Sequence, residues 1–101
     1  MQYHVYILLC ADGSYYTGLT TDLEYRLAQH NAGEIPGAYT ATRRPVKLVW
    51  FDTFPSKHDA FLRERQIKGW SRAKKETLIN NDWERLQSVV RLERQNRESM
   101  K

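Results

Sequence analysis

The sequence predicts a single α+β domain with the element order ββαβααα. The chain has 101 residues, 41% of them apolar, which suffices for one modest core and is too little for two. Two β-type segments lie on either side of an Asp-Gly turn signal near the N-terminus, and helix-capping signals recur along the rest of the chain. We therefore expect a domain over residues 1–80 and a C-terminal helix over residues 81–101 that packs on it or extends from it.

The N-terminal segment predicts a β-hairpin. From residue 3 to residue 10, the odd-numbered and the even-numbered side chains form two alternating sets. This is typical of a strand, in which successive side chains point to opposite faces of the sheet. Asp12-Gly13 is a strong hairpin turn signal, and residues 15–19 then form the second strand. Cys10 ends the first strand, where it is either a small apolar strand residue or a catalytic thiol.

The length of the hairpin loop decides whether two tyrosines can share a site. A two-residue loop would place Tyr6 and Tyr16 on opposite faces of the sheet. A three-residue loop over residues 12–14, closed by a glycine-type bulge, would place both tyrosines and Gly18 on one face. The sequence leaves both registers open.

The next segments predict a helix, a loop and a third strand. Thr21 and Glu24 have the spacing of a capping box, and Gly33 can end a helix in the left-handed conformation, so residues 22–32 should be helical. Residues 33–44 form a loop. Residues 46–54 are rich in β-branched and aromatic side chains and are expected to form the central strand of the sheet.

Helices follow the third strand. Ser56, three residues before Asp59, predicts a cap for a helix over residues 57–68 that stops at Gly69. A short basic helix is expected over residues 71–79. A further capping-box pattern then precedes the apolar stripe of the last helix, which consists of Trp83, Leu86, Val89 and Val90.

The composition favours a soluble cytoplasmic protein. The apolar stretch over residues 5–11 is too short for a membrane span and lacks the basic flank and cleavage pattern of a secretory signal. The single Cys10 cannot form an internal disulfide, in agreement with a reducing compartment. One cysteine and three scattered histidines also lack the ligand spacing of a structural zinc site.

Positive charge is concentrated in the middle of the chain. The net charge of +4 divides into −3 for residues 1–42, +7 for residues 43–75 and zero for residues 76–101. Such a block suits a polyanionic partner, because lysine and arginine that neutralise phosphates release counterions. An ordinary solvated face is the alternative. Basic and aromatic side chains that could contact phosphates and stack on bases or sugars are Tyr39, Arg43, Arg44, Lys68, Arg72, Lys74 and Lys75, with Trp70 between them.

The first predicted helix carries a polar pair at the border of its buried side. Arg26 and His30 are four residues apart, so they lie on one face of the helix beside Leu23 and Leu27. A guanidinium offers a forked donor to phosphate oxygens, and an imidazole can relay a proton near neutral pH. For His30, the alternative is a structural role. For each tyrosine on a strand, the alternative is a packing role.

Glu64 is expected on the inward face of its helix, where Ala60, Phe61 and Ile67 bracket it. An unpaired carboxylate that faces a core is costly, so Glu64 should be paired, coordinate a cation or line a cleft. An ion pair with Lys68 or with a loop arginine is one possibility. The other is Mg²⁺, which commonly takes one carboxylate, several waters and substrate phosphate.

Taken in order, Tyr6, Tyr16-Thr17-Gly18, Arg26, His30 and Glu64 resemble the GIY-YIG nuclease superfamily. The two triplets read His4-Val5-Tyr6 and Tyr16-Thr17-Gly18, so His4 and Val5 stand for Gly-Ile, and Thr17 stands for Ile. The resemblance covers roughly residues 3–80. It looks closest to small stand-alone bacterial members of largely unassigned function, which are echoed by Ala38-Tyr39-Thr40, Arg44-Pro45-Val46 and Ile67-Lys68-Gly69-Trp70.

The resemblance implies a three-stranded antiparallel sheet flanked by helices and the metal-dependent hydrolysis of phosphodiester bonds in DNA. It implies that Tyr6 is the general base and that His30 and Tyr16 orient and polarise Tyr6 or the attacking water. Arg26 would stabilise charge on the scissile phosphate, and Glu64 would hold Mg²⁺ or Mn²⁺. Gly18 would be a structural part of the site.

The leading expectation is therefore a DNA endonuclease or nickase, with branched or damaged DNA as candidate substrates and DNA repair as the candidate process. The segment beyond the family domain is too short for a separate DNA-reading module, so a homodimer or a protein partner is a candidate source of specificity. The alternatives are a nucleic-acid-binding module that cleaves weakly or not at all, and a purely structural interaction protein.

Overall fold

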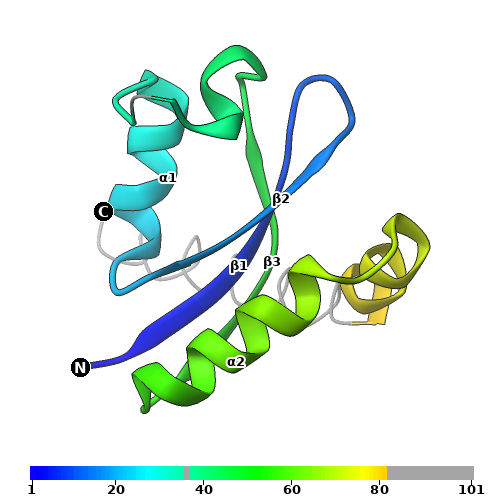
Figure 1. The fold of residues 1–101 in the computed structure, drawn as a ribbon. Helices are drawn as coiled ribbons and strands as arrows, with labels where there is room; N and C mark the ends of the chain where they lie inside the picture. Colours follow the sequence, from blue (N-terminus) through cyan, green and yellow to red (C-terminus); the bar gives the residue numbers. More distant parts are fainter. Residues whose placement is uncertain (36, 82–101) are drawn as a thin grey trace, which may run out of the picture.

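A computed structural model describes residues 1–35 and 37–81, and it confirms the expected α+β fold with a three-stranded antiparallel sheet (Figure 1). The order of elements is the expected ββαβααα as far as residue 81, and the helix expected over the stripe from Trp83 onward lies outside the described residues. None of the described helices is long and apolar enough to cross a membrane. The elements are β1 (Tyr3–Leu9), β2 (Tyr15–Thr20), α1 (Leu23–Ala32), the 3-10 helix η1 (Tyr39–Thr42), β3 (Lys47–Phe54), α2 (Lys57–Lys68) and a helical segment over residues 72–81.

The central strand of the sheet is β1, and not β3 as expected, because the strand order is β2-β1-β3. Residues 5–8 of β1 are all buried, whereas β3 has one buried residue, Trp50. A strand that is covered on both faces and paired at both edges reads as a continuous apolar run. The run Val-Tyr-Ile-Leu in β1 carries this signal more clearly than the mixed sequence of β3 does.

Helices cover both faces of the sheet (Figure 1). One face, which includes Val5 and Ile7, packs against Ala60 and Ile67 of α2 and against Ile79. The other face packs against α1, and its buried core consists of Tyr6, Leu8, Cys10 and Val46, with Leu23 and Leu27 of the helix packed against it. Even-numbered residues of β1 therefore face α1, and odd-numbered residues face α2.

The hairpin adopts neither of the two expected loops, but it puts the two tyrosines on one face. Tyr6 pairs with Gly18 and Leu8 pairs with Tyr16, so five residues, 10–14, join the strands. The loop is closed by a hydrogen bond from the Cys10 backbone N–H to the Ser14 carbonyl oxygen at 2.8 Å. Because the number of loop residues is odd, Tyr6 and Tyr16 both face α1.

Local capping signals hold at most helix ends. The Ser56 side chain accepts a hydrogen bond from the Asp59 backbone N–H at 3.4 Å, and Gly33 ends α1 with a φ of 69°. The expected capping box at Thr21 is wrong, because Asp22 caps α1 and accepts from the Tyr25 backbone N–H at 3.0 Å. An Asp side chain satisfies the same helix N–H groups as Thr does, so the helix begins one residue later.

Candidate active site

A buried hydrogen-bonded chain links three side chains between the sheet and α1. The Tyr6 hydroxyl lies 3.1 Å from Nε2 of His30, and Nδ1 of His30 lies 2.7 Å from the Thr40 hydroxyl. The three residues come from β1, α1 and η1, and each is at most 2% exposed. The register of the hairpin, the packing of α1 and the turn of η1 together fix the position of this imidazole.

The surroundings of His30 define its protonation state. Burial, and then the nearby Arg26 guanidinium, lower the pKa of His30, so the imidazole is neutral at pH 7 and carries one N–H. Arg26 also donates a hydrogen bond to the oxygen of Tyr6, which leaves the Tyr6 hydroxyl free to donate to Nε2. We therefore assign the proton of His30 to Nδ1, where it donates to the Thr40 hydroxyl.

The protein keeps Tyr6 protonated. Burial, and then the neighbouring Tyr16, raise the pKa of Tyr6 to about 12, and the opposing effect of Arg26 is smaller. At pH 7 only about one molecule in 10⁵ would carry the phenolate, a cost of roughly 7 kcal/mol. In the protein without substrate, the surroundings of Tyr6 therefore disfavour its phenolate. The protonated hydroxyl of Tyr6 lies within hydrogen-bond distance of Nε2 of His30.

Gly18 makes room for the hydroxyl end of Tyr6. The two residues are directly opposed in the β1–β2 pair, and the phenol ring lies over the glycine. A Cβ atom on Gly18 would overlap Cζ and the hydroxyl of Tyr6, and it would lie 3.0 Å from Cε1 of Tyr16. Only glycine at this position lets Tyr6 reach His30.

Tyr16 borders the same site from β2. Its ring centroid lies 5.1 Å from that of His30 and 6.2 Å from that of Tyr6, both in tilted or edge-on geometry. On its outer side it stacks on Tyr39 at 6.4 Å, and Tyr39 is 43% exposed. An accessible aromatic ring therefore lies at the entrance to the buried chain of hydrogen bonds.

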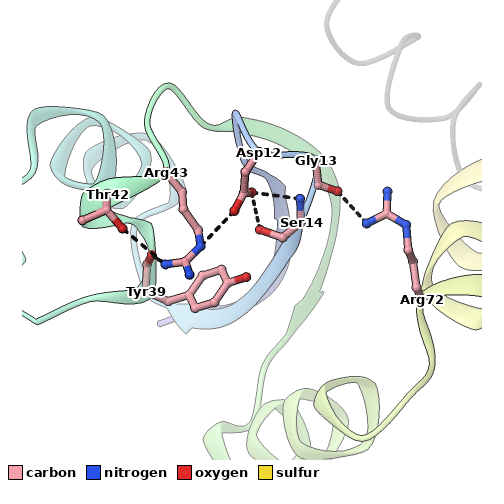
Figure 2. A network of polar contacts seen from close by, with 7 residues as sticks. All are labelled: Asp12, Gly13, Ser14, Tyr39, Thr42, Arg43 and Arg72. Atoms are coloured by element: carbon pink, nitrogen blue, oxygen red, sulfur yellow. Dashed lines mark hydrogen bonds and ion pairs between the residues drawn. The ribbon is translucent and has the colours of Figure 1, made fainter.

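Arg43 holds Tyr39 against the hairpin loop (Figure 2). Its guanidinium lies 3.8 Å from the Tyr39 ring centroid and donates to the Tyr39 carbonyl oxygen at 2.7 Å. The Nε–H of the same side chain forms an ion pair with Asp12 at 3.0 Å. Arg43, expected as a phosphate contact, thus connects η1 to the hairpin, and Asp12 is a structural partner that the sequence did not point out.

Arg26 lies beside Tyr6 with an unused donor. One guanidinium N–H donates to the Gln29 side-chain oxygen at 3.4 Å. Its Nε is buried and has no hydrogen-bond partner among the described residues. A buried N–H without a partner costs free energy, and it is suited to an anion that enters the site.

Glu64 lies on α2, which packs on the face of the sheet opposite to the one that carries Tyr6 and His30. Its side chain is 13% exposed, and one carboxylate oxygen lies 2.8 Å from Nζ of Lys68. Its charge is close enough to contribute to the raised pKa of Tyr6. The prediction that Phe61 points inward is wrong, because its side chain is 44% exposed. Ala60 and Ile67 make the narrow buried face of α2.

Three of the other expected phosphate contacts, Arg44, Arg72 and Lys74, have partners within the chain. Arg44 donates to the carbonyl oxygens of Asn31 and Ala41 and so holds the end of α1. Arg72 donates to the Gly13 carbonyl oxygen of the hairpin loop (Figure 2) and pairs with Glu76 at 3.0 Å. The ammonium of Lys74 lies 4.4 Å from the Trp70 ring centroid, and Lys75 is half-buried beside Lys68.

Cys10 belongs to the core on the α1 face, where it is 4% exposed. Burial raises the pKa of its thiol, so the thiolate needed for nucleophilic attack is disfavoured. The structure thus supports the interpretation of Cys10 as a small apolar core residue, although it lies in the hairpin loop just after β1 and not in the strand.

Thr17 and Thr40 allow a test with matched substitutions. Both are buried, but the Thr17 hydroxyl has no hydrogen-bond partner among the described residues, whereas the Thr40 hydroxyl bonds to His30. Thr17→Val should raise the free energy of unfolding in urea by about 1 kcal/mol, because it removes an unsatisfied polar group and keeps the shape. Thr40→Val should lower it by about 1–3 kcal/mol. A destabilised Thr17→Val would mean that this hydroxyl is bonded in solution.

The geometry thus brings together Tyr6, Tyr16, Gly18, Arg26 and His30, whereas Glu64 lies on α2 and is linked to them by the effect of its charge on the pKa of Tyr6. Thr40, which fixes the orientation of His30, was not expected as part of the site. The sequence held only a weak signal for it, the position of Thr40 in a stretch shared with the small family members.

Comparison with known proteins places the chain in a family. The model of the GIY-YIG catalytic domain matches residues 2–77, so this protein belongs to the GIY-YIG family. Among its relatives are UPF0213 proteins of Halobacterium salinarum, 53% identical over 76% of this chain and 99% of the relative, and of Staphylococcus haemolyticus, 52% identical over 77% and 94%.

Solved structures agree with this assignment. The solution NMR structure of a UPF0213 protein from Bacillus halodurans is 44% identical and covers 82% of this chain and 87% of its own, with a TM-score of 0.55. The solution NMR structure of a protein from E. faecalis is 35% identical over 80% of this chain and 85% of its own, with a TM-score of 0.57. The family carries a nuclease-type domain.

Proposed function

We propose that this protein is an endonuclease that hydrolyses phosphodiester bonds in DNA with the help of one divalent metal ion, Mg²⁺ or Mn²⁺. The observation that carries the proposal is the buried hydrogen bond between Tyr6 and a neutral His30, in a chain that belongs to a nuclease-type family. In the cytoplasm, at neutral pH, this pair supplies a proton acceptor that needs no free phenolate.

The proton is taken up in a relay. A water molecule that attacks phosphorus gives a proton to the Tyr6 oxygen while Tyr6 gives its own proton to Nε2 of His30. The water oxygen forms the new bond to phosphorus, the bond to the leaving oxygen breaks, and that oxygen is protonated by solvent. His30 becomes an imidazolium whose Nδ1–H still donates to Thr40. Concerted transfer avoids the cost of roughly 7 kcal/mol for a standing phenolate at pH 7.

Arg26 and Tyr16 serve the substrate. The buried Nε–H of Arg26 is a ready donor for a non-bridging phosphate oxygen, and the guanidinium charge stabilises the negative charge that develops there. Tyr16 holds the edge of His30 and separates it from solvent, and the exposed Tyr39 offers a ring on which a base or sugar can stack. Lys68, Arg72, Lys74 and Lys75 supply positive charge for backbone contacts.

The donor set fits a hydrated Mg²⁺ or Mn²⁺ at Glu64. The described residues contain no group of three or more His, Cys, Asp or Glu that could enclose an ion. A single carboxylate, with water and substrate phosphate as the other ligands, is what Mg²⁺ commonly takes. When bound, such an ion would neutralise charge on the phosphate and the leaving oxygen.

Removal of the carboxylate tests this proposal. Glu64→Gln should lower cleavage of supercoiled plasmid and branched DNA by about 10²-fold or more in Mg²⁺, because the amide lacks the charge that holds the cation. A chelator should have a similar effect on the unaltered protein. The rates are measured by gel electrophoresis, with Glu34→Gln, which alters an exposed loop glutamate, as the control.

Two results would contradict parts of this proposal, the first the role of the metal and the second the enzymatic activity. Cleavage that persists in chelator and in Glu64→Gln would remove the metal from the proposal. Salt-sensitive DNA binding by the unaltered protein without cutting of any of these substrates would favour a nucleic-acid-binding module on the same fold.

A further inference from the structure

The ion pair between Glu64 and Lys68 occupies the carboxylate to which the proposed function assigns the metal. The two groups lie 2.8 Å apart, yet their surroundings differ, because the side chain of Glu64 is 13% exposed and that of Lys68 is 52% exposed. The carboxylate of Glu64 is thus mostly shielded from water by the protein. The lysine reaches it from solvent.

We propose that Lys68 and the divalent cation are alternative partners of Glu64, so that Lys68 sets the metal concentration at which the site fills. This inference rests on the proposed function, which places the cation at Glu64. An ammonium in contact with the carboxylate and a doubly charged ion on the same group would repel each other strongly. Of the two, the half-exposed lysine can leave, because an exposed ion pair is weak and its flexible stem extends easily into water.

A second lysine strengthens the argument. Lys75 is half-buried, and burial, followed by the charge of Lys68, lowers the pKa of Lys75. Two ammonium groups therefore lie close together, and one of them, that of Lys68, contacts the Glu64 carboxylate. A cation that arrives at Glu64 meets a local excess of positive charge, which lowers its affinity until Lys68 moves away.

Binding of Mn²⁺ to the metal-free full-length protein, measured by calorimetry without nucleic acid, tests the exchange. Lys68→Met should bind Mn²⁺ more tightly by up to about 5-fold, the range that corresponds to the strength of an exposed ion pair. Lys75→Met removes an equal charge that has no ion pair with Glu64 among the described residues, so its gain should be smaller. Lys68→Arg keeps a competing cation and should bind Mn²⁺ as the unaltered protein does.

The controls separate this inference from the proposed function. If Glu64→Gln binds Mn²⁺ as well as the unaltered protein does, the metal site itself is misplaced. If binding depends on Glu64 but Lys68→Met shows no gain, or the same gain as Lys75→Met, the exchange is overturned while the metal site stands. Thermal unfolding of each variant checks that the substitution leaves the fold intact.

Discussion

Replacing Tyr6 with phenylalanine should lower the rate of DNA cleavage by about 10²–10⁴-fold and leave DNA affinity nearly unchanged. Phenylalanine fills the same buried space over Gly18, but it lacks the hydroxyl that joins His30 to the attacking water. Single-turnover cleavage in Mg²⁺ and fluorescence anisotropy in chelator measure the two effects. Tyr25→Phe, an exposed position on α1, is the matched control and should cleave normally.

The same variant reports the state of Tyr6 without any substrate. Because the pKa of Tyr6 is raised to about 12, the folded protein holds this proton more tightly than the unfolded chain, whose tyrosines titrate near pH 10. The stabilisation is fully present below pH 10 and is lost as the pH rises from 10 to 12. At most about 2.7 kcal/mol is at stake.

Urea unfolding between pH 9 and 12 measures this loss. The unaltered protein should lose stability more steeply than Tyr6→Phe does, since the phenylalanine variant has no proton to lose at this position. Parallel losses in the two proteins would mean that Tyr6 titrates as an ordinary tyrosine. Equal cleavage rates would independently remove Tyr6 from the proton relay.

The elements that the sequence predicted well are those set by local chemistry. The Ser56 cap and the left-handed Gly33 depend on side chains within four residues, and both are found where expected. Capping signals do not always identify the exact residue. The sequence predicted Thr21 as the cap of α1, but Asp22 caps it, because neighbouring residues of similar chemistry compete for the same helix N–H groups.

Strand order and hairpin register depend on contacts between distant residues. β1 became the central strand because both of its faces are covered, one by α1 and one by α2, and neither helix is adjacent to β1 in the chain. The five-residue hairpin loop is held partly by Arg43, which pairs with Asp12 from 31 residues away. The turn propensity of Asp12-Gly13 reflects only neighbouring residues and not the distant contact with Arg43. The sequence therefore left the register of the hairpin open.

The candidate site was predictable as a set of residues but not as a geometry. Tyr6, Arg26 and His30 could be named from spacing and family resemblance. The pKa of Tyr6 and the orientation of His30 could not be predicted, because the first depends mostly on burial and the second depends on Thr40, in a short 3-10 helix where the sequence predicted a loop. The proposed proton relay therefore rests on the fold and not on the motif alone.

Gly18→Ala should disable the site through geometry alone. The new methyl group would overlap the Tyr6 hydroxyl, so the ring must move away from its position 3.1 Å from Nε2 of His30. Overpacking of this kind costs about 1–3 kcal/mol of folding free energy. Cleavage should fall nearly as far as in Tyr6→Phe, although every catalytic side chain is retained.

A double-mutant cycle shows whether Gly18 acts through Tyr6. In Tyr6→Phe the relay is already lost, so adding Gly18→Ala should lower cleavage little further, and the two changes should be strongly non-additive. Gly69→Ala is the control, because a methyl group there makes only ordinary contacts, at 3.6 Å or more, and the backbone is right-handed. Additive losses in the cycle would show that Gly18 supports cleavage by some route other than the contact between Tyr6 and His30.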